Sequence, residues 1–211
     1  NAKLRKAREA GAYAVELVKA GRKPSELITR EVLMNAIMFD MAVAGSTNAV
    51  LHLQSYAYEL GIRVTLNDFE KYAAQIPCIN AVVPSGPYTV VDFHYAGGVM
   101  NVMKQLESRL FTDAPGMYGV TWKEMLSKVT PQENKVIHSL EKPLFNEPGL
   151  KILRGNLSPG GAIVRPTAVY EEVKYMKGKA KVFDGDREAF DAIQAGEIVP
   201  GDIIVIRYEG C

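Results

Sequence analysis

Four consecutive residues, Gly45, Ser46, Thr47 and Asn48, interrupt a long apolar stretch and have the chemistry to bind an anion. The apolar patterns on both sides fit helices, so the four residues should join two helices end to end. Gly45 can adopt the positive φ that ends a helix. Ser46, Thr47 and Asn48 can each cap the next helix, whose free N–H groups attract carboxylates and phosphates. A plain interhelical turn is the alternative, and these residues alone favour it.

A second candidate is His94, which follows Asp92 by two positions and precedes the glycine pair Gly97-Gly98. A histidine in such a setting can shuttle a proton or donate a hydrogen bond to a substrate. A single histidine near the start of a helix more often caps or packs, and the residues alone favour that role. His52 lies inside an apolar stretch, so we expect it to be a buried core histidine.

The sequence lacks the residue patterns of common metal sites and nucleophilic centres. It has no Cys-x-x-Cys, no His-x-x-x-His and no calcium-loop pattern of aspartates. Nucleophile elbows and Gly-Lys-Ser/Thr phosphate loops are also absent. Its two cysteines, Cys78 and Cys211, cannot hold a cluster by themselves.

Composition excludes several functional classes. The 211 residues include 25 basic and 24 acidic side chains, which gives a net charge of +1 and does not favour nucleic acid or an anionic membrane as partner. Aromatic residues are not interleaved with a basic patch. No apolar run reaches the roughly 20 residues of a membrane span, and the start of the chain is not a secretory signal. With two cysteines and no disulfide framework, a cytoplasmic location is expected.

The patterns change from helical to strand-like around residue 135, which indicates a domain boundary near residues 130–148. Helices are predicted over 2–20, 30–44, 46–60, 69–76, 90–110 with a break at Gly97-Gly98, and 121–129. Strands are predicted over 150–154, 162–165, 179–183 and 203–207, with a helix over 186–195. We therefore predict an α/β protein in which residues 1–140 form a helix-rich segment. Residues 141–211 then begin a small β-barrel or β/α domain.

Short motifs along the whole chain resemble those of one enzyme family. They are Ile28-Thr-Arg-Glu31, Asn35-Ala-Ile37, Gly45-Ser-Thr-Asn48 with Leu51-His-Leu53, Pro84-Ser-Gly86, Asp92-x-His-x-Ala-Gly-Gly98, Leu153-Arg-Gly-Asn-Leu-Ser-Pro159, Ala180-Lys-Val-Phe183 and Pro200-Gly-Asp202 through Gly210. In this order they resemble dihydroxy-acid dehydratases and their sugar-acid relatives, which act on gluconate, phosphogluconate, arabinonate and xylonate. The resemblance implies an α/β/α domain followed by a C-terminal β-barrel-like (swivelling β/β/α) domain.

The resemblance also implies a hydro-lyase reaction, in which a 2,3-dihydroxy acid loses water to give a 2-oxo acid. In this family an iron–sulfur cluster acts on the departing hydroxyl, Mg²⁺ helps to hold the substrate, and a serine alkoxide removes the C2 proton. The family's cluster cysteines and its acidic and modified-lysine metal ligands lie upstream of Asn1. Its catalytic serine and another metal-binding glutamate lie downstream of Cys211. The resemblance therefore implies no catalytic residue, no metal ligand and no bound cofactor within this chain. Ala44 and Pro87 replace a glycine and a lysine that are common in the family.

With the resemblance, we predict that Ser46, Thr47 and Asn48 bind a small anionic hydroxy-acid substrate and that His94 lines the same cleft. We expect the chain to be the central part of a longer dehydratase, inactive alone, whose parent is a homo-oligomer (a dimer or tetramer). A stand-alone binding or assembly module on the same scaffold is the alternative. The pattern around His94 leaves open whether the substrate is a branched-chain dihydroxy acid or a sugar acid.

Overall fold

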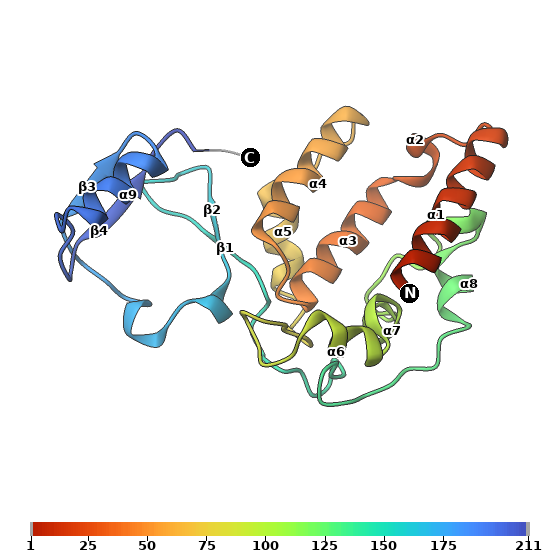
Figure 1. Cartoon of the computed structure of the whole chain (residues 1–211). Helices are drawn as coiled ribbons and strands as arrows, with labels where there is room; N and C mark the ends of the chain where they lie inside the picture. The colour runs from red at the N-terminus through yellow and green to blue at the C-terminus, as the bar shows by residue number, and fades with distance from the viewer. Residues whose placement is uncertain (1, 210–211) are drawn as a thin grey trace. The chain divides into compact units, whose positions relative to one another are not determined.

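The computed structural model describes residues 2–209, without the side chains of Ala2 and Tyr118, so the expectations for Cys211 lie outside the described residues. The chain forms two compact units, Asn1–Thr167 and Ala168–Cys211. The first unit contains eight α-helices and one β-hairpin (Figure 1) among its described residues. These are α1 (Ala2–Lys19), α2 (Pro24–Leu27), α3 (Arg30–Ala42), α4 (Thr47–Glu59), α5 (Leu66–Ala73), α6 (Val90–Tyr95), α7 (Gly98–Gln105), α8 (Trp122–Leu126), β1 (Lys151–Leu153) and β2 (Ala162–Val164).

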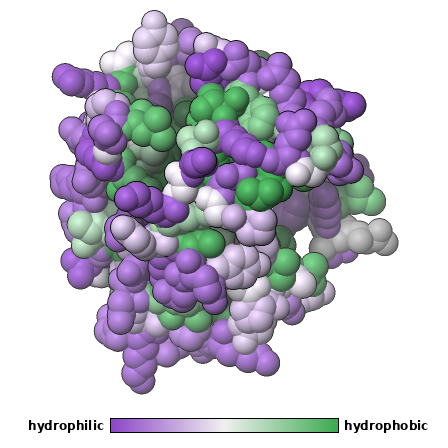
Figure 2. Space-filling model, turned by 90° about the vertical axis from the view of Figure 1, so that its left-hand side faces the viewer, coloured by the Kyte–Doolittle hydropathy of each residue, from purple (hydrophilic) through white to green (hydrophobic). Residues whose placement is uncertain are grey.

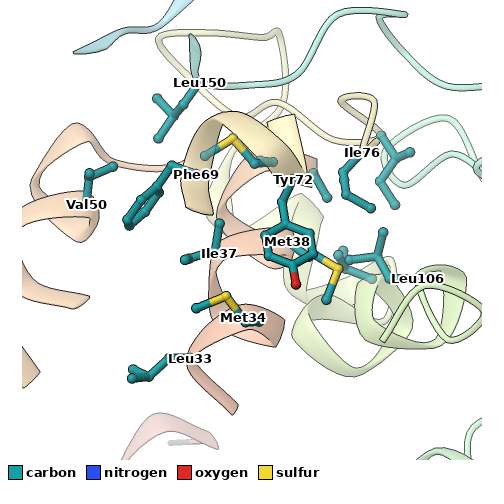
Figure 3. Packing of buried hydrophobic residues seen from close by; sticks show 14 of the residues in the cluster. Leu33, Met34, Ile37, Met38, Val50, Phe69, Tyr72, Ile76, Leu106 and Leu150 are labelled. Atoms are coloured by element: carbon teal, nitrogen blue, oxygen red, sulfur yellow. The ribbon is translucent and has the colours of Figure 1, made fainter. Parts of the chain in front are cut away.

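Helix α3 is the centre of the first unit. Its side chains are apolar on most faces, as the sequence predicts, and it packs against α4, α5 and α7. Figure 3 shows Ile37 and Met38 of α3 among Phe69 and Tyr72 of α5, with Leu106 at the end of α7 beside them. Because these side chains are almost fully buried, the end of α3 is held in a fixed place.

Most predicted helix starts are confirmed by their caps. Thr121 begins α8 with a capping box, in which its backbone N–H donates to Glu124 at 2.8 Å and its hydroxyl accepts from the Glu124 N–H at 3.2 Å. The predicted break near Gly97-Gly98 is confirmed too, because Gly97 has φ +101 and separates α6 from α7. These starts follow local rules of capping and glycine conformation, which a sequence displays directly.

The strands form two separate pairs. In the first unit β1 and β2 pair antiparallel, with Ile152 opposite Ile163. In the second unit β3 (Ala180–Phe183) and β4 (Ile203–Ile206) pair in parallel, with α9 (Asp186–Gln194) between them in the chain. The α/β character is confirmed, whereas the described residues contain no closed sheet, so the barrel-like domain and the boundary at residue 140 stay predictions. Short 3₁₀ helices complete the two units: Met117–Gly119, Pro166–Ala168 and Glu171–Val173.

The face drawn in Figure 2 carries hydrophilic and apolar side chains side by side. Figure 2 shows hydrophobic residues at several places on one face, separated by hydrophilic ones. In the second unit, Val182 and Phe190 are each about half exposed. Among the described residues, no helix is both long enough and apolar enough to cross a membrane.

Candidate functional site

The end of α3 is closed by residues from distant parts of the chain. The Gly45 N–H donates to the Asp40 carbonyl at 3.0 Å. This bond joins the second residue after the C-cap, Val43, to the third-last residue of α3, as in a common type of helix end. This bond leaves Ala44 in the left-handed position, with φ +47. The predicted positive φ at Gly45 is therefore wrong: it falls one residue earlier. The Met41 carbonyl accepts from the Gly149 N–H. The Ala42 carbonyl accepts from the N–H groups of Ile79 and Asn80.

Gly45 is needed for close approach and not for its backbone angle. A Cβ built on Gly45 would overlap Oδ1 of Asp40, and it would lie 2.8 Å from Cγ of the same side chain. Asp40 is only 6% exposed. Burial raises its carboxyl pKa to about 6, while a hydrogen bond from the Ser46 N–H and the positive charge of Arg165 oppose part of that rise. The junction thus contains a buried acid that the glycine accommodates.

Arg165 approaches the same junction from the other side. Its Nη2 donates to the Gly45 carbonyl at 2.6 Å, and its Nη1 donates to the Ser85 hydroxyl at 3.3 Å. Ser85 is itself buried, in the loop between α5 and α6. The guanidinium therefore ties the interhelical junction to that loop.

The start of α4 lines a cavity. The Ser46 hydroxyl caps α4 by accepting from the Asn48 N–H at 3.2 Å, which confirms the predicted helix start. Thr47 and Asn48 are exposed and line a cavity of about 350 Å³. Most of the other lining residues are apolar or small, and they come from α4, α5 and the β1–β2 hairpin: Leu51, Gln54, Leu66, Gly161, Ala162 and Ile163. The cavity therefore combines the positive end of a helix with a largely apolar wall.

His94 is not among the residues that line this cavity. It is exposed on α6, with its ring 5.5 Å from the Tyr95 ring. The nearby Asp92 carboxylate turns back to its own helix start, where it accepts from the Thr89 N–H at 2.8 Å and from the Thr89 hydroxyl at 2.7 Å. These bonds hold the Asp92 pKa below its usual value. Asp92 is thus a capping residue, and a role for His94 in the cleft stays a prediction.

His52 corrects a further expectation, because it is exposed and not buried. Helix α4 buries Val50 and Ala57, and His52 lies on the opposite face. Asp40, Arg165 and Ser85 are the site residues that sequence reasoning missed. Asp40 carried a signal, since it is the one acidic residue over positions 32–44 of an apolar helical stretch. Ser85 lies in the Pro84-Ser-Gly86 motif, but nothing in that motif indicated a contact with the junction, and Arg165 carried no signal.

The described residues do not fit an iron–sulfur cluster or a Mg²⁺ site. They contain no group of three or more His, Cys, Asp or Glu side chains placed to hold a metal ion. Cys78 is buried, and its Sγ donates to the Asn80 carbonyl at 3.2 Å. Burial raises the pKa of this thiol to about 11, so it is protonated at neutral pH.

Comparison with known proteins identifies the family. Residues 1–125 match the family described as "Dihydroxy-acid/6-phosphogluconate dehydratase N-terminal", and residues 135–211 match its C-terminal counterpart. The chain belongs to this dehydratase family. The resemblance predicted from the motifs is therefore confirmed.

Named relatives in the dehydratase family are similar along nearly the whole chain. A dihydroxy-acid dehydratase of Clostridium novyi is 43% identical over 206 residues, which cover 97% of this chain. One from Methanosarcina barkeri is 42% identical over 212 residues, and one from Methanococcus aeolicus is 39% identical over 209, each covering 99% of this chain. The chain spans only 37% to 38% of the length of these relatives.

Proposed function

We propose that this chain forms part of a hydro-lyase that removes water from a 2,3-dihydroxy acid to give a 2-oxo acid. The family membership and the names of the relatives support this reaction. The observation that carries the local role is the cavity at the start of α4, where Thr47 and Asn48 are exposed. In this proposal Ser46 shapes the helix tip, while Thr47 and Asn48 donate hydrogen bonds to the substrate carboxylate or hydroxyls.

The cofactors in this proposal belong to the longer protein. An iron–sulfur cluster and Mg²⁺ would supply positive charge at the departing hydroxyl and the carboxylate. Since the described residues do not fit either group, the isolated chain is proposed to be inactive. A cytoplasmic location and a homo-oligomeric parent complete the proposal by family resemblance.

The proposal is tested in the full-length enzyme that contains this chain. Thr47→Val and Asn48→Ala should each raise KM for 2,3-dihydroxy-3-methylbutanoate or gluconate by about tenfold, because each removes a hydrogen bond to a charged or polar substrate. Ser55→Ala, on the exposed surface of α4, is the matched control and should leave KM unchanged. Formation of the 2-oxo acid is the assay. If neither variant changes kcat/KM, the tip does not bind substrate, and a purely structural junction replaces this proposal.

A further inference from the structure

A buried carboxylate and a half-buried guanidinium, of opposite charge, act on one peptide unit at the junction. The Gly45 carbonyl accepts from the Arg165 guanidinium, and the N–H of the same peptide, which belongs to Ser46, donates to the Asp40 carboxylate. In a trans peptide the C=O and the N–H point in opposite directions. The two side chains therefore hold this peptide from opposite sides.

The two charges are placed for this peptide and not for each other. Oδ2 of Asp40 and Nε of Arg165 are both buried and have no hydrogen-bond partner in the part of the chain that the structure describes. A side-on ion pair, in which Nε and one terminal nitrogen bind the two carboxylate oxygens, would have used these atoms. Instead the two terminal nitrogens of the guanidinium donate hydrogen bonds to the Gly45 carbonyl and to the Ser85 hydroxyl.

Such an arrangement is costly for folding alone. Buried charges lose their hydration, and replacing a buried charge pair with apolar residues is often neutral or stabilising. Helix α3 is otherwise apolar on the side where Asp40 lies buried. Since burial of Asp40 destabilises the fold, we look for a functional reason for it. The peptide that Asp40 and Arg165 hold directly precedes Thr47 and Asn48.

We propose that Asp40 and Arg165 are positioning residues, which fix the Gly45–Ser46 peptide and with it the direction in which Thr47 and Asn48 face the cavity. This rests on the proposed function of the α4 tip. Neither residue needs to touch the substrate. Ser85 supports Arg165 and should contribute less, because it holds only one of the two terminal nitrogens.

The test compares variants of the full-length enzyme. Arg165→Gln should raise KM about tenfold while kcat changes less than threefold, since the helix tip is misdirected and the reacting groups remain. Arg165→Lys should recover part of the loss, because one ammonium can still reach the Gly45 carbonyl. Arg30→Gln is the matched control: Arg30 also binds a carbonyl and a carboxylate, but at the other end of α3.

A pH profile separates positioning from mere stability. Arg165 is the charged group that acts on Asp40, and protonation of the Asp40 carboxylate weakens its hold on the Ser46 N–H. The unaltered enzyme should therefore lose kcat/KM on the acid side near pH 6, and Asp40→Asn should remove this fall. If the acid limb is unchanged in Asp40→Asn, the proposal is overturned.

Two further outcomes are decisive. If Thr47→Val and Asn48→Ala raise KM but Arg165→Gln behaves like Arg30→Gln, the positioning role fails while the proposed function stands. If Arg165→Gln does not fold, Ser85→Ala and Arg165→Lys decide. An increase of about threefold in KM for Ser85→Ala supports the proposal, and unchanged KM in both variants overturns it.

Discussion

Replacing Gly45 with alanine tests whether the buried acid sets the residue type at the junction. The added Cβ would overlap Oδ1 of Asp40, lie 2.8 Å from its Cγ and lie 3.1 Å from its backbone oxygen. The carboxylate would have to move by roughly 1.5 Å to restore normal contact. Gly45 does not have a positive φ, so the backbone itself tolerates alanine. The whole effect should come from the displaced carboxylate.

The expected cost is about 3 kcal/mol of unfolding free energy. Overpacking a tight site costs about 1–3 kcal/mol, and weakening a hydrogen bond to a charged group adds about 1.5–3 kcal/mol. Removing the carboxylate first, with Asp40→Ala, should reduce the cost of Gly45→Ala to about 1 kcal/mol, since only the backbone oxygen remains close. The two changes should therefore show a coupling of about 2 kcal/mol.

Urea unfolding at pH 7, followed by the fluorescence of Trp122, measures these values. Trp122 is the one tryptophan in the sequence and lies in the same compact unit. Gly155→Ala is the control, because its Cβ would meet nothing within 4 Å and its φ is not positive, and it should change stability by less than about 0.5 kcal/mol. Additive effects of Gly45→Ala and Asp40→Ala, within about 0.5 kcal/mol, would refute the reasoning.

Three other outcomes are expected. The pKa of Asp40 is raised from 3.8 to about 6 in the folded chain, so the folded chain binds this proton more tightly than the unfolded chain does. The contribution of Asp40 to the unfolding free energy is therefore fully present below pH 4. It falls by about 3 kcal/mol as the pH rises through 6. Asp40→Asn should lack this fall in urea unfolding from pH 4 to 7, and an equal fall in the variant contradicts the assignment. In a Cys211→Ser variant, Cys78 should react with iodoacetamide at pH 8 only as fast as the chain unfolds. The reason is that its thiol is buried and has a pKa of about 11. Rapid labelling of the folded chain contradicts this. Ala44→Val should lower the unfolding free energy by about 2 kcal/mol, because a β-branched residue is strained at φ +47, whereas Ala44→Gly should change it by less than about 1 kcal/mol; equal stabilities of the two variants contradict the strain.

The sequence predicts most helix starts and the cap at the start of α4, because these follow from local rules. The caps at Ser46 and Thr121 and the break at Gly97 can be recognised from residue type and spacing alone. The exposed position of His52 also follows from the 3.6-residue period, which places Val50 and Ala57 on the buried face of α4. The expectation of a core histidine used the apolar stretch and neglected that period.

The parts that could not be predicted depend on contacts between distant residues. The left-handed residue falls on Ala44 and not on Gly45, because the Gly45 N–H bonds to the Asp40 carbonyl and so closes the helix around residue 44. Gly45 is required for another reason: the buried Asp40 carboxylate occupies the space where a Cβ at position 45 would stand. Arg165 joins Gly45 across 120 positions of sequence. No local pattern shows which distant guanidinium will reach a given carbonyl, so the link between the junction and the hairpin emerges only in three dimensions.

The closure of α3 by later residues sets an order for events during synthesis. A chain made from its N-terminus could form α3 and α4 early, since both depend on local hydrogen bonds. The carbonyls at the end of α3 would still wait for the N–H groups of Ile79 and Gly149, and the Gly45 carbonyl would wait for Arg165. Each of these contacts closes a loop of chain, and the loss of conformational entropy opposes each closure. The α4 tip therefore reaches its final form only after β2 has left the ribosome, which makes it among the last features of the first unit to mature.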